Sequence, residues 1–501
     1  MSYQKRWLTL LSGGCCLVGL AVAQETGPAA QGPVDEKLAR LTGLLEAQQR
    51  RLQTLEAQVF AVHTRDAERA RVELMRAQIR EVLGESEFRE SLMQSTTQAG
   101  YNGGFFIRSS DDQFELKING RIQFRWTHYA TRSGNKYLNP GLQRDDRTGF
   151  DVQRIRLGFR GHAYDRNLTY RVVLRMGASN SYDTRLHYAY LNYKFREEFQ
   201  FRAGIFKIAS TRAQMTSSAK LQFVDRPAAD AVFQFSRGLG VRFWGRLFDK
   251  RLDYYLDIVN SFNGVNNRTI TPDPAELDGN PGIVFHAVWH AFGDNPGKDF
   301  KSQADHAFHE SPALDFGFHY AFNDDQSDAR TTRIPFKLPR RFGTGGFGNT
   351  TTNGLQINQF GLESAFKWNG FSATGEYILR IVDVRRATRR PFTPLFLATG
   401  DDSTTTMHGA YLQVGYFLPI PGLEKKLEAV GRVGGISVLS GGQEGTWEYA
   451  GGLNYYIQGD KVKLQTDVTK VSEVPIRSSS GSLANVNDDA LIFRVQLQVS
   501  F

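Results

Sequence analysis

The sequence predicts a transmembrane antiparallel β-barrel of about 16 strands, preceded by an α-helical coiled-coil segment. Three observations predict the barrel: apolar and polar residues alternate through most of the chain, the connections alternate between long and short, and the last strand-like run ends in phenylalanine. Composition agrees, since aromatic residues make up 12% of the 501 residues while the mean hydropathy is negative. Strands that place every second side chain in lipid produce this combination.

The N-terminus predicts a secretory signal peptide over residues 1–23. Lys5 and Arg6 precede an apolar stretch, and a small-x-small cleavage motif ends at Ala23. A lipoprotein signal acylated at Cys15 is the alternative, but the residues before this cysteine lack the expected branched apolar side chain.

Removal of the signal peptide changes both the charge and the cysteine content. The formal charge of +9 becomes +7, because two basic residues leave with it. Cys15 and Cys16 are the only two cysteines, so the mature chain would have no disulfide and no Cys-based metal site. A surplus of positive charge favours anionic partners without identifying one.

A periplasmic coiled coil and helix are expected over residues 34–94, after a Gly-, Pro- and Ala-rich linker at 24–33. Apolar residues follow a heptad of about four repeats and then lose it near Asp66, beyond which a second helical stretch follows. The predicted core positions are Leu38, Leu41, Leu45, Gln48, Leu52, Leu55, Val59 and Val62. Such a narrow apolar stripe usually pairs with partner helices, and a lone helix packed on the barrel is the alternative. A homotrimer is expected, although the core residues alone do not distinguish a dimer from a trimer.

The barrel is expected over residues 114–501, after a second linker at 95–113. Phe114, Leu116 and Ile118 begin the first run of alternating apolar residues. Runs of this kind start near residues 114, 150, 168, 184, 199, 238, 252, 281, 312, 354, 371, 408, 426, 446, 461 and 490. The segment 293–311 is a long connection where a short turn is due, so the predicted strand count could change by about two. The run that ends at Phe501 resembles the C-terminal signal of bacterial outer-membrane proteins.

Several short strings, spread over residues 101–501, resemble the phosphate-selective porins O and P. They are Tyr101–Phe105, Phe114–Gln123, Gly204–Lys207, Phe223–Arg226, Arg237–Val241 and Asn260–Gly264. The resemblance implies a sixteen-stranded trimeric porin whose third extracellular loop enters the lumen, with arginines and a lysine-containing site that guide phosphate or related anions. The chain departs from that pattern in its N-terminal coiled coil, and residues 216–220 only resemble the serine–lysine site.

Basic residues share the polar sides of the early strands, where a lipid-facing charge would cost about 2 to 4 kcal/mol. They are therefore expected to face the lumen, where arginine offers a fork that binds phosphate or carboxylate oxygens. The predicted pore and anion-binding residues are Arg121, Arg125, Arg154, Arg156, Arg160, Arg171, Arg175, Lys207, Arg212, Ser217, Ser218, Lys220 and Arg226. Pairing of these arginines with lumen carboxylates such as Glu115 and Asp151 is the structural alternative.

Other functions are less well supported by the sequence. His286 and His290 suggest a metal or triad, but no Gly-x-Ser-x-Gly or His-Glu-x-x-His string is present, so no catalytic residue, metal or cofactor is expected. No nucleic-acid partner is expected either. The predicted function is a porin in the outer membrane of a Gram-negative-type bacterium, in contact with its lipid, that passes small anions such as phosphate or polyphosphate. A general or sugar-type porin, or a tether that reaches the cell wall through the periplasmic coiled coil, is the alternative.

Overall fold

A computed structural model describes residues 33–84, 97–131, 146–176, 184–260, 262, 280–325, 352–386, 404–439, 445–472 and 489–501. The predicted signal peptide at 1–23 lies outside the described residues. The chain divides into two units, residues 1–94 and residues 95–501, and each has its own architecture.

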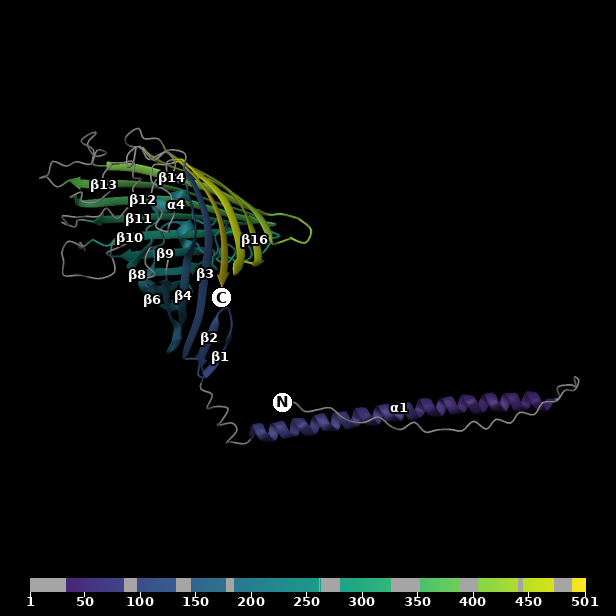
Figure 1. Cartoon of the computed structure of the whole chain (residues 1–501). Helices are drawn as coiled ribbons and strands as arrows, with labels where there is room; N and C mark the ends of the chain where they lie inside the picture. Colours follow the sequence, from purple (N-terminus) through teal and green to yellow (C-terminus); the bar gives the residue numbers. More distant parts are fainter. Residues whose placement is uncertain are drawn as a thin grey trace, which may run out of the picture. The chain divides into compact units, whose positions relative to one another are not determined.

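The first unit contains one long helix, α1 (Pro33–Gly84), drawn in purple in Figure 1. It continues without a break through Asp66, where the sequence predicted the end of the first helical stretch. Leu41, Leu45 and Leu52 are 59–69% exposed, so these predicted core positions of the heptad face solvent on the single chain. None of the described helices combines the length and the apolar character needed to cross a membrane.

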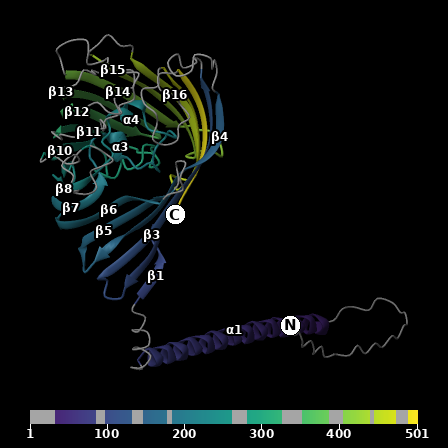
Figure 2. The same cartoon turned by 60° about the vertical axis from the view of Figure 1, so that its left-hand side comes forward.

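The second unit is a closed antiparallel β-barrel of sixteen strands, β3 to β18 (Figures 1 and 2). Each strand pairs with its sequence neighbours, and β18 closes the ring by pairing with β3. The first eight strands are β3 (Phe114–Thr131), β4 (Arg147–Ala163), β5 (Asp165–Met176), β6 (Arg185–Arg196), β7 (Phe199–Lys207), β8 (Arg237–Leu247), β9 (Leu252–Val259) and β10 (Gly282–Phe292). The other eight are β11 (Ala313–Asp325), β12 (Thr352–Trp368), β13 (Phe371–Arg386), β14 (Thr404–Phe417), β15 (Leu427–Val438), β16 (Thr446–Gln458), β17 (Val462–Val471) and β18 (Ala490–Ser500).

The predicted strand pattern is confirmed. The largest difference in a strand start is four residues, at β14, which begins at Thr404 rather than near 408. The long connection at 293–312 is real and does not hide a further pair of strands. The segment 95–113, expected to be a linker, instead contains a hairpin of β1 (Thr97–Tyr101) and β2 (Phe105–Ser109). Strand β2 of this hairpin pairs with the start of β3, at residues 115–118, whereas β18 pairs with β3 at residues 121–131.

The barrel wall has its apolar side chains outside and its polar side chains inside, as a lipid-embedded barrel requires. In β18, Leu491 and Phe493 are 49% and 37% exposed, whereas Arg494, Gln496 and Gln498 are buried. The same alternation in the other strands produces an apolar outer face and a polar lumen. This distribution makes the barrel a transmembrane one, because a soluble barrel would reverse it.

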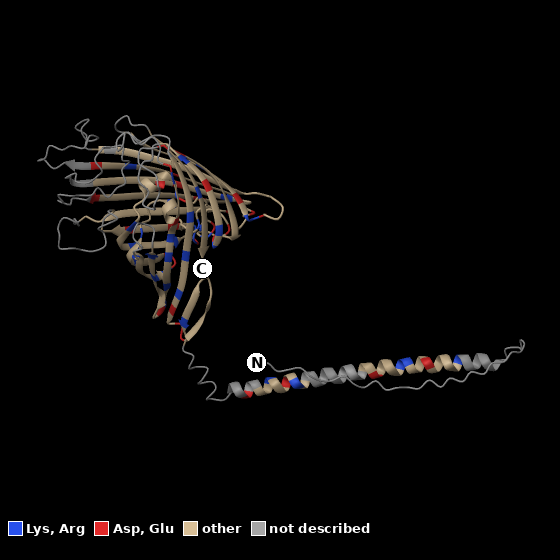
Figure 3. Cartoon of the chain, viewed as in Figure 1, with Lys and Arg blue, Asp and Glu red and all other residues tan. Residues whose placement is uncertain are grey.

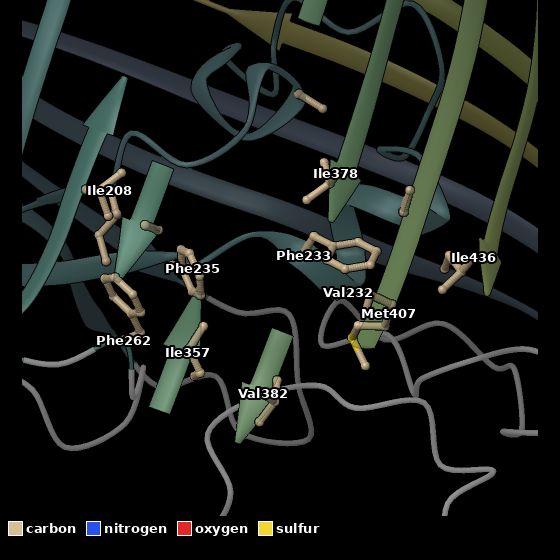
Figure 4. Close-up of a cluster of buried hydrophobic side chains, with 14 of the residues drawn as sticks. Ile208, Val232, Phe233, Phe235, Phe262, Ile357, Ile378, Val382, Met407 and Ile436 are labelled. Atoms are coloured by element: carbon tan, nitrogen blue, oxygen red, sulfur yellow. The ribbon is translucent and has the colours of Figure 1, made fainter. Parts of the chain in front are cut away.

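Two connections fill much of the lumen. The inserted loop, residues 208–236 between β7 and β8, contains the short helices α3 (Arg212–Met215) and α4 (Ala228–Phe233). Figure 2 shows both helices inside the barrel. Phe233 and Val232 of α4 pack on Ile378, Met407 and Ile436 of the wall (Figure 4). The long turn, residues 293–312 between β10 and β11, also contacts this loop, as Gln303 N donates to the Lys220 carbonyl at 3.1 Å.

The last residue of the chain closes the barrel seam and provides a test of it. Phe501 exchanges two backbone hydrogen bonds with Gly120 of β3, and a Cβ at Gly120 would overlap the Phe501 ring. We expect Gly120→Val to destabilise the barrel by about 1 to 3 kcal/mol through overpacking. Heat-induced loss of the folded band on a gel measures this. Gly149→Val, in open space on β4, is the matched control, and an equal loss of stability in both variants would contradict the prediction.

Candidate functional site

The charges of the lumen are divided between two walls. Figure 3 shows basic segments gathered on the early strands β3 to β6, and acidic residues appear on later ones. Six inward-facing carboxylates lie on strands β11 to β17, and each is at most 5% exposed. They are Asp315, Glu363, Glu376, Glu428, Glu448 and Asp467. This set is called the acidic wall below.

The inserted loop covers the acidic wall, and its backbone and side chains supply the hydrogen bonds that buried carboxylates need. Val224 N donates to Asp467 at 3.0 Å, and Ala228 N donates to Glu448 at 2.8 Å. The Gln222 side chain donates to Glu428 at 2.5 Å. The loop therefore removes these negative charges from the space that remains in the lumen.

Arg212 is the strongest single anchor of the loop to the acidic wall. Its guanidinium lies 3.0 Å from Asp315 and 3.0 Å from Glu363, and its backbone N donates to Glu376 at 3.0 Å. Burial opposes the charge of Arg212, but the two carboxylates outweigh this and raise its pKa above the ordinary value. The guanidinium is thus a fixed positive charge that two carboxylates balance.

Asp225 anchors the other end of the loop. Arg125 and Arg494 each lie 3.0 Å from its carboxylate, and Arg154 lies 3.6 Å away. Burial opposes ionisation, but these guanidinium groups prevail and hold the pKa of Asp225 well below its ordinary value. Asp225 therefore pairs with three arginines that could otherwise bind an anion.

Replacement of Asp225 by asparagine should reduce the free energy of unfolding by about 3 to 5 kcal/mol, because three arginines lose their shared acceptor. A lowered carboxylate pKa contributes stability above the ordinary pKa of about 4, and this stability is lost as the pH falls through the lower folded value. The difference in the free energy of unfolding between wild type and variant should therefore become smaller at acidic pH. Thermal denaturation at pH 7 and pH 3 measures both effects. Asp249→Asn, in an exposed turn, is the control, and a constant difference at both pH values would contradict the account.

The long turn is hydrogen-bonded both to the barrel wall and to the inserted loop. Lys367 of β12 donates to the carbonyl oxygens of Asp299 and Ala304, each at 2.8 Å, and of Ser302 at 2.9 Å. Gln222 N of the inserted loop donates to the Gln303 side chain at 2.9 Å. The long turn and the inserted loop are therefore joined by hydrogen bonds, and together they fill the part of the lumen next to the later strands.

A cavity of about 410 Å³ remains between the inserted loop and the early strands. Seven arginines and two lysines line it, and among its described lining residues there is no Asp or Glu. These cations are Arg121, Arg156, Arg171, Arg202, Lys207, Lys220, Arg226, Arg237 and Arg242. Tyr188, Tyr190, Ser217 and Ser218 add hydroxyl groups. This set is called the cationic cavity below.

Short polar and aromatic side chains hold these cations in place. Arg121 donates to Ser218 Oγ at 2.8 Å and to Ser217 Oγ at 3.4 Å. Arg202 lies over the Tyr190 ring at 4.3 Å from its centroid, which orients the guanidinium without neutralising it. Among the nine, Arg242 has a close carboxylate partner, Asp257, at 2.5 Å, and Arg226 has a more distant one, Asp230, at 3.7 Å. Hydroxyls and guanidinium groups of this kind can replace part of the hydration shell of an anion.

Eight of the thirteen predicted site residues line the cationic cavity. They are Arg121, Arg156, Arg171, Lys207, Ser217, Ser218, Lys220 and Arg226. The other five do not line it. Arg125, Arg154 and Arg212 bond to carboxylates as described above, Arg160 is exposed and donates to the Gly103 carbonyl at 3.3 Å, and Arg175 lies outside the lining. The structural alternative therefore applies to Arg125, Arg154 and Arg212. Arg212 pairs with wall carboxylates, whereas the partner of Arg125 and Arg154 is Asp225 of the loop.

The prediction missed three cations and two tyrosines of the cavity: Arg202, Arg237, Arg242, Tyr188 and Tyr190. A signal for two of them was present in the sequence. Arg202 and Arg242 occupy polar positions of alternating strands, and they are register partners across β7 and β8. The tyrosines also lay on an alternating strand, but an aromatic residue does not reveal which face of a barrel it occupies.

One family model matches part of the chain. Residues 121–251 match the model of the phosphate-selective porin O and P family. The porin O and P match covers β3 from Arg121, the strands β4 to β8 and the inserted loop, which together contain most of the cavity lining. A search of curated proteins found no match. The match and the barrel support an outer-membrane channel of porin type rather than an enzyme.

Solved structures of outer-membrane proteins are similar to this chain at low sequence identity. The anion-selective porin from Comamonas acidovorans is 8% identical, with a TM-score of 0.49, and the alignment covers 77% of this chain and 100% of that one. OmpT of Vibrio cholerae, folded in vitro, is 10% identical, with a TM-score of 0.48 and coverage of 78% and 98%. The outer membrane channel DcaP of Acinetobacter baumannii is 10% identical, with a TM-score of 0.46 and coverage of 80% and 100%. The fold itself is established by the closed strand pairing described above.

Proposed function

We propose that this protein is an outer-membrane porin whose water-filled channel favours anions and lets small solutes diffuse passively. One observation carries the proposal: nine cations and no Asp or Glu line the cationic cavity, as far as the described residues show. Several moderate sites in series attract anions without holding any one of them too tightly, which conduction requires. The family match is consistent with this function.

Phosphate, or a polyphosphate, is the proposed solute class. Arginine forks bind phosphate oxygens in pairs, and Ser217 and Ser218 supply hydroxyls beside Arg121. The description of the matching family as phosphate-selective supports the same class. A general porin is the alternative, because guanidinium groups also bind carboxylates and sulfates.

The proposed function is tested by the reversal potential of the purified protein in a planar bilayer under a potassium chloride gradient, followed by titration with phosphate. Anion selectivity that phosphate blocks at low concentration supports a phosphate channel. Anion selectivity without phosphate block supports a general anion porin. An unselective pore, or no conductance, would contradict the proposal.

We further propose that the protein is a homotrimer in outer-membrane lipid and that α1 contributes to assembly from the periplasm. Several of its heptad leucines are exposed on the single chain, where burial against partner helices would stabilise them. A tether to the cell wall through the same helix is the second candidate role. Deletion of residues 24–100 separates the two functions: a porin keeps its conductance, whereas a protein that acts only as a tether loses its role.

A further inference from the structure

Two histidines and two glutamates from four consecutive strands meet beneath the anchor of the inserted loop. His286 of β10 and His319 of β11 are direct register partners, and so are Glu363 of β12 and Glu376 of β13. Donor atoms of His319, Glu363 and Glu376 all lie within 4.8 Å of one another, and His286 Nε2 is 3.3 Å from Glu363 Oε2. All four side chains are at most 5% exposed.

Two glycines on the strands next to this cluster leave space for its side chains. Gly361 lies opposite His319, and Gly317 lies opposite Glu363. A Cβ at Gly361 would overlap the His319 ring, and a Cβ at Gly317 would overlap the Glu363 side chain. The two glycines therefore let both side chains lie along the lumen wall, where their donor atoms converge.

Each carboxylate uses one oxygen, Oε1, for the inserted loop. Glu363 leaves its other oxygen for the cluster, whereas Glu376 Oε2 also accepts from Tyr411 OH at 3.3 Å and keeps one further lone pair for the cluster. Arg212 donates to Glu363 Oε1 through its guanidinium and to Glu376 Oε1 through its backbone N, both at 3.0 Å. Within the described part of the chain, Glu363 Oε2 and the Nδ1 atoms of His286 and His319 have no hydrogen-bond partner. Buried polar atoms are rarely left in this state, so the cluster has unused binding capacity.

The local charge also favours a bound cation. Asp315 and Glu363 share the single guanidinium of Arg212, and Glu376 accepts from the backbone N of the same residue, so the buried carboxylates outnumber their nearest fixed positive charge. Two carboxylates this close repel each other in a buried site, and a divalent cation between them removes that repulsion. Carboxylate ligands that are themselves hydrogen-bonded by outer groups, as here by Arg212, are typical of protein metal sites.

We propose that His319, Glu363 and Glu376, with His286 as a fourth donor, form a divalent transition-metal site that suits Zn²⁺. Imidazole nitrogen combined with carboxylate oxygen fits Zn²⁺, whereas Mg²⁺ and Ca²⁺ prefer oxygen ligands alone. The site differs from the sequence-based expectation of no metal, because its four residues span 90 positions (from 286 to 376) and only the strand register unites them. It does not depend on the proposed conduction function.

One neighbouring amide turns when the ion binds. Gln359 places its side-chain N 3.1 Å from His319 Nε2 and accepts from Arg380 through its oxygen. When Nδ1 binds the metal, Nε2 carries the proton, so the amide must present its oxygen to the ring. Arg380 then still has the carbonyl oxygens of Val232 and Phe233, at 3.2 and 2.6 Å.

The test uses the full-length protein in detergent micelles after treatment with a chelator. Co²⁺ is titrated while visible absorption is recorded, and Zn²⁺ content is then measured by mass spectrometry. We expect one specific ion per chain, the absorption bands of a low-coordinate Co²⁺ site, and displacement of Co²⁺ by Zn²⁺. His319→Leu and Glu376→Gln should each weaken binding by at least the roughly 10- to 100-fold that outer-shell changes produce. His162→Gln, at another buried histidine, which lies on β4 outside the cluster, is the control.

Gln359→Glu provides a second, opposite test. A carboxylate at this position accepts the Nε2–H of His319 without having to turn, so Co²⁺ should bind roughly tenfold more tightly. This variant and Glu376→Gln keep the test decisive if His319→Leu does not form a barrel. Absence of a specific ion in the wild type, or equal Co²⁺ affinity in the wild type and the cluster variants, would overturn the proposal.

Discussion

Replacement of Arg156 and Arg171 by glutamine should lower the anion-to-cation permeability ratio of the channel by roughly 10- to 30-fold. Both side chains line the cationic cavity, and Arg171 is exposed to the space inside it. A unit charge about 4 Å from an ion contributes about 1 kcal/mol in a water-like medium, so two charges contribute about 2 kcal/mol. Reversal potentials in a planar bilayer under a salt gradient measure the ratio directly.

The control for this experiment lies on the same strand as Arg156. Arg160 carries the same charge on β4 but is absent from the cavity lining. Arg160→Gln should therefore leave the permeability ratio nearly unchanged, because its charge is screened from the path of the ion. An effect of Arg160→Gln as large as that of the double variant would show that net charge, rather than the cavity, determines selectivity.

Replacement of Arg212 by alanine should produce both a large loss of stability and an increase in conductance. Asp315 and Glu363 lose their shared cation while they remain buried, at a cost of about 3 to 5 kcal/mol. The inserted loop then loses its main anchor to the acidic wall, so more of the lumen opens and these carboxylates face the ions. Thermal denaturation and single-channel conductance measure the two effects, and the permeability ratio should move toward cations.

Arg212→Lys distinguishes the charge from the geometry of the guanidinium. A lysine retains the positive charge but lacks the planar fork that reaches two carboxylates at once. It should restore part of the stability and keep the loop against the wall, with an intermediate conductance. Unchanged conductance in Arg212→Ala would contradict the view that the inserted loop sets the size of the channel.

Most of the barrel could be predicted because the alternation of apolar and polar residues is a local pattern within each strand. A side-chain period of two is visible in each run by itself, and the sixteen starts follow from it within four residues. The hairpin of β1 and β2 could not be predicted in this way. Its strands have five residues each and pair only with one another and with the start of β3, so too little periodicity is present to detect.

The candidate site was predicted in part, for a physical reason that Arg121 and Arg125 illustrate. Both lie on the polar side of β3, and the sequence gives no means to tell them apart. Arg121 lines the cavity, whereas Arg125 is neutralised by Asp225, a residue 100 positions away on the inserted loop. Alternation predicts which side of the wall a residue occupies, but only the path of the loop decides which lumen arginines remain available to an ion.

The same limit applies to the acidic wall. Its carboxylates could be assigned to the lumen from their alternation alone, which would suggest a lumen of mixed charge. In the structure, loop donors such as Val224 N and Ala228 N cover Asp467 and Glu448, and arginines of the wall pair with both, so these carboxylates do not line the cationic cavity. A sequence contains no direct record of such coverage, since the contacts join residues more than 200 positions apart.

The central claim is that ions pass through the cationic cavity, and a single introduced cysteine tests it most directly. With Cys15 and Cys16 replaced by serine, Ser217→Cys places one thiol on the cavity lining. The account predicts that a sulfonate-bearing methanethiosulfonate reagent reacts faster than a trimethylammonium-bearing one and reduces the current, since the cations attract the first and repel the second. Modification without loss of current, or faster reaction with the cationic reagent, would contradict it.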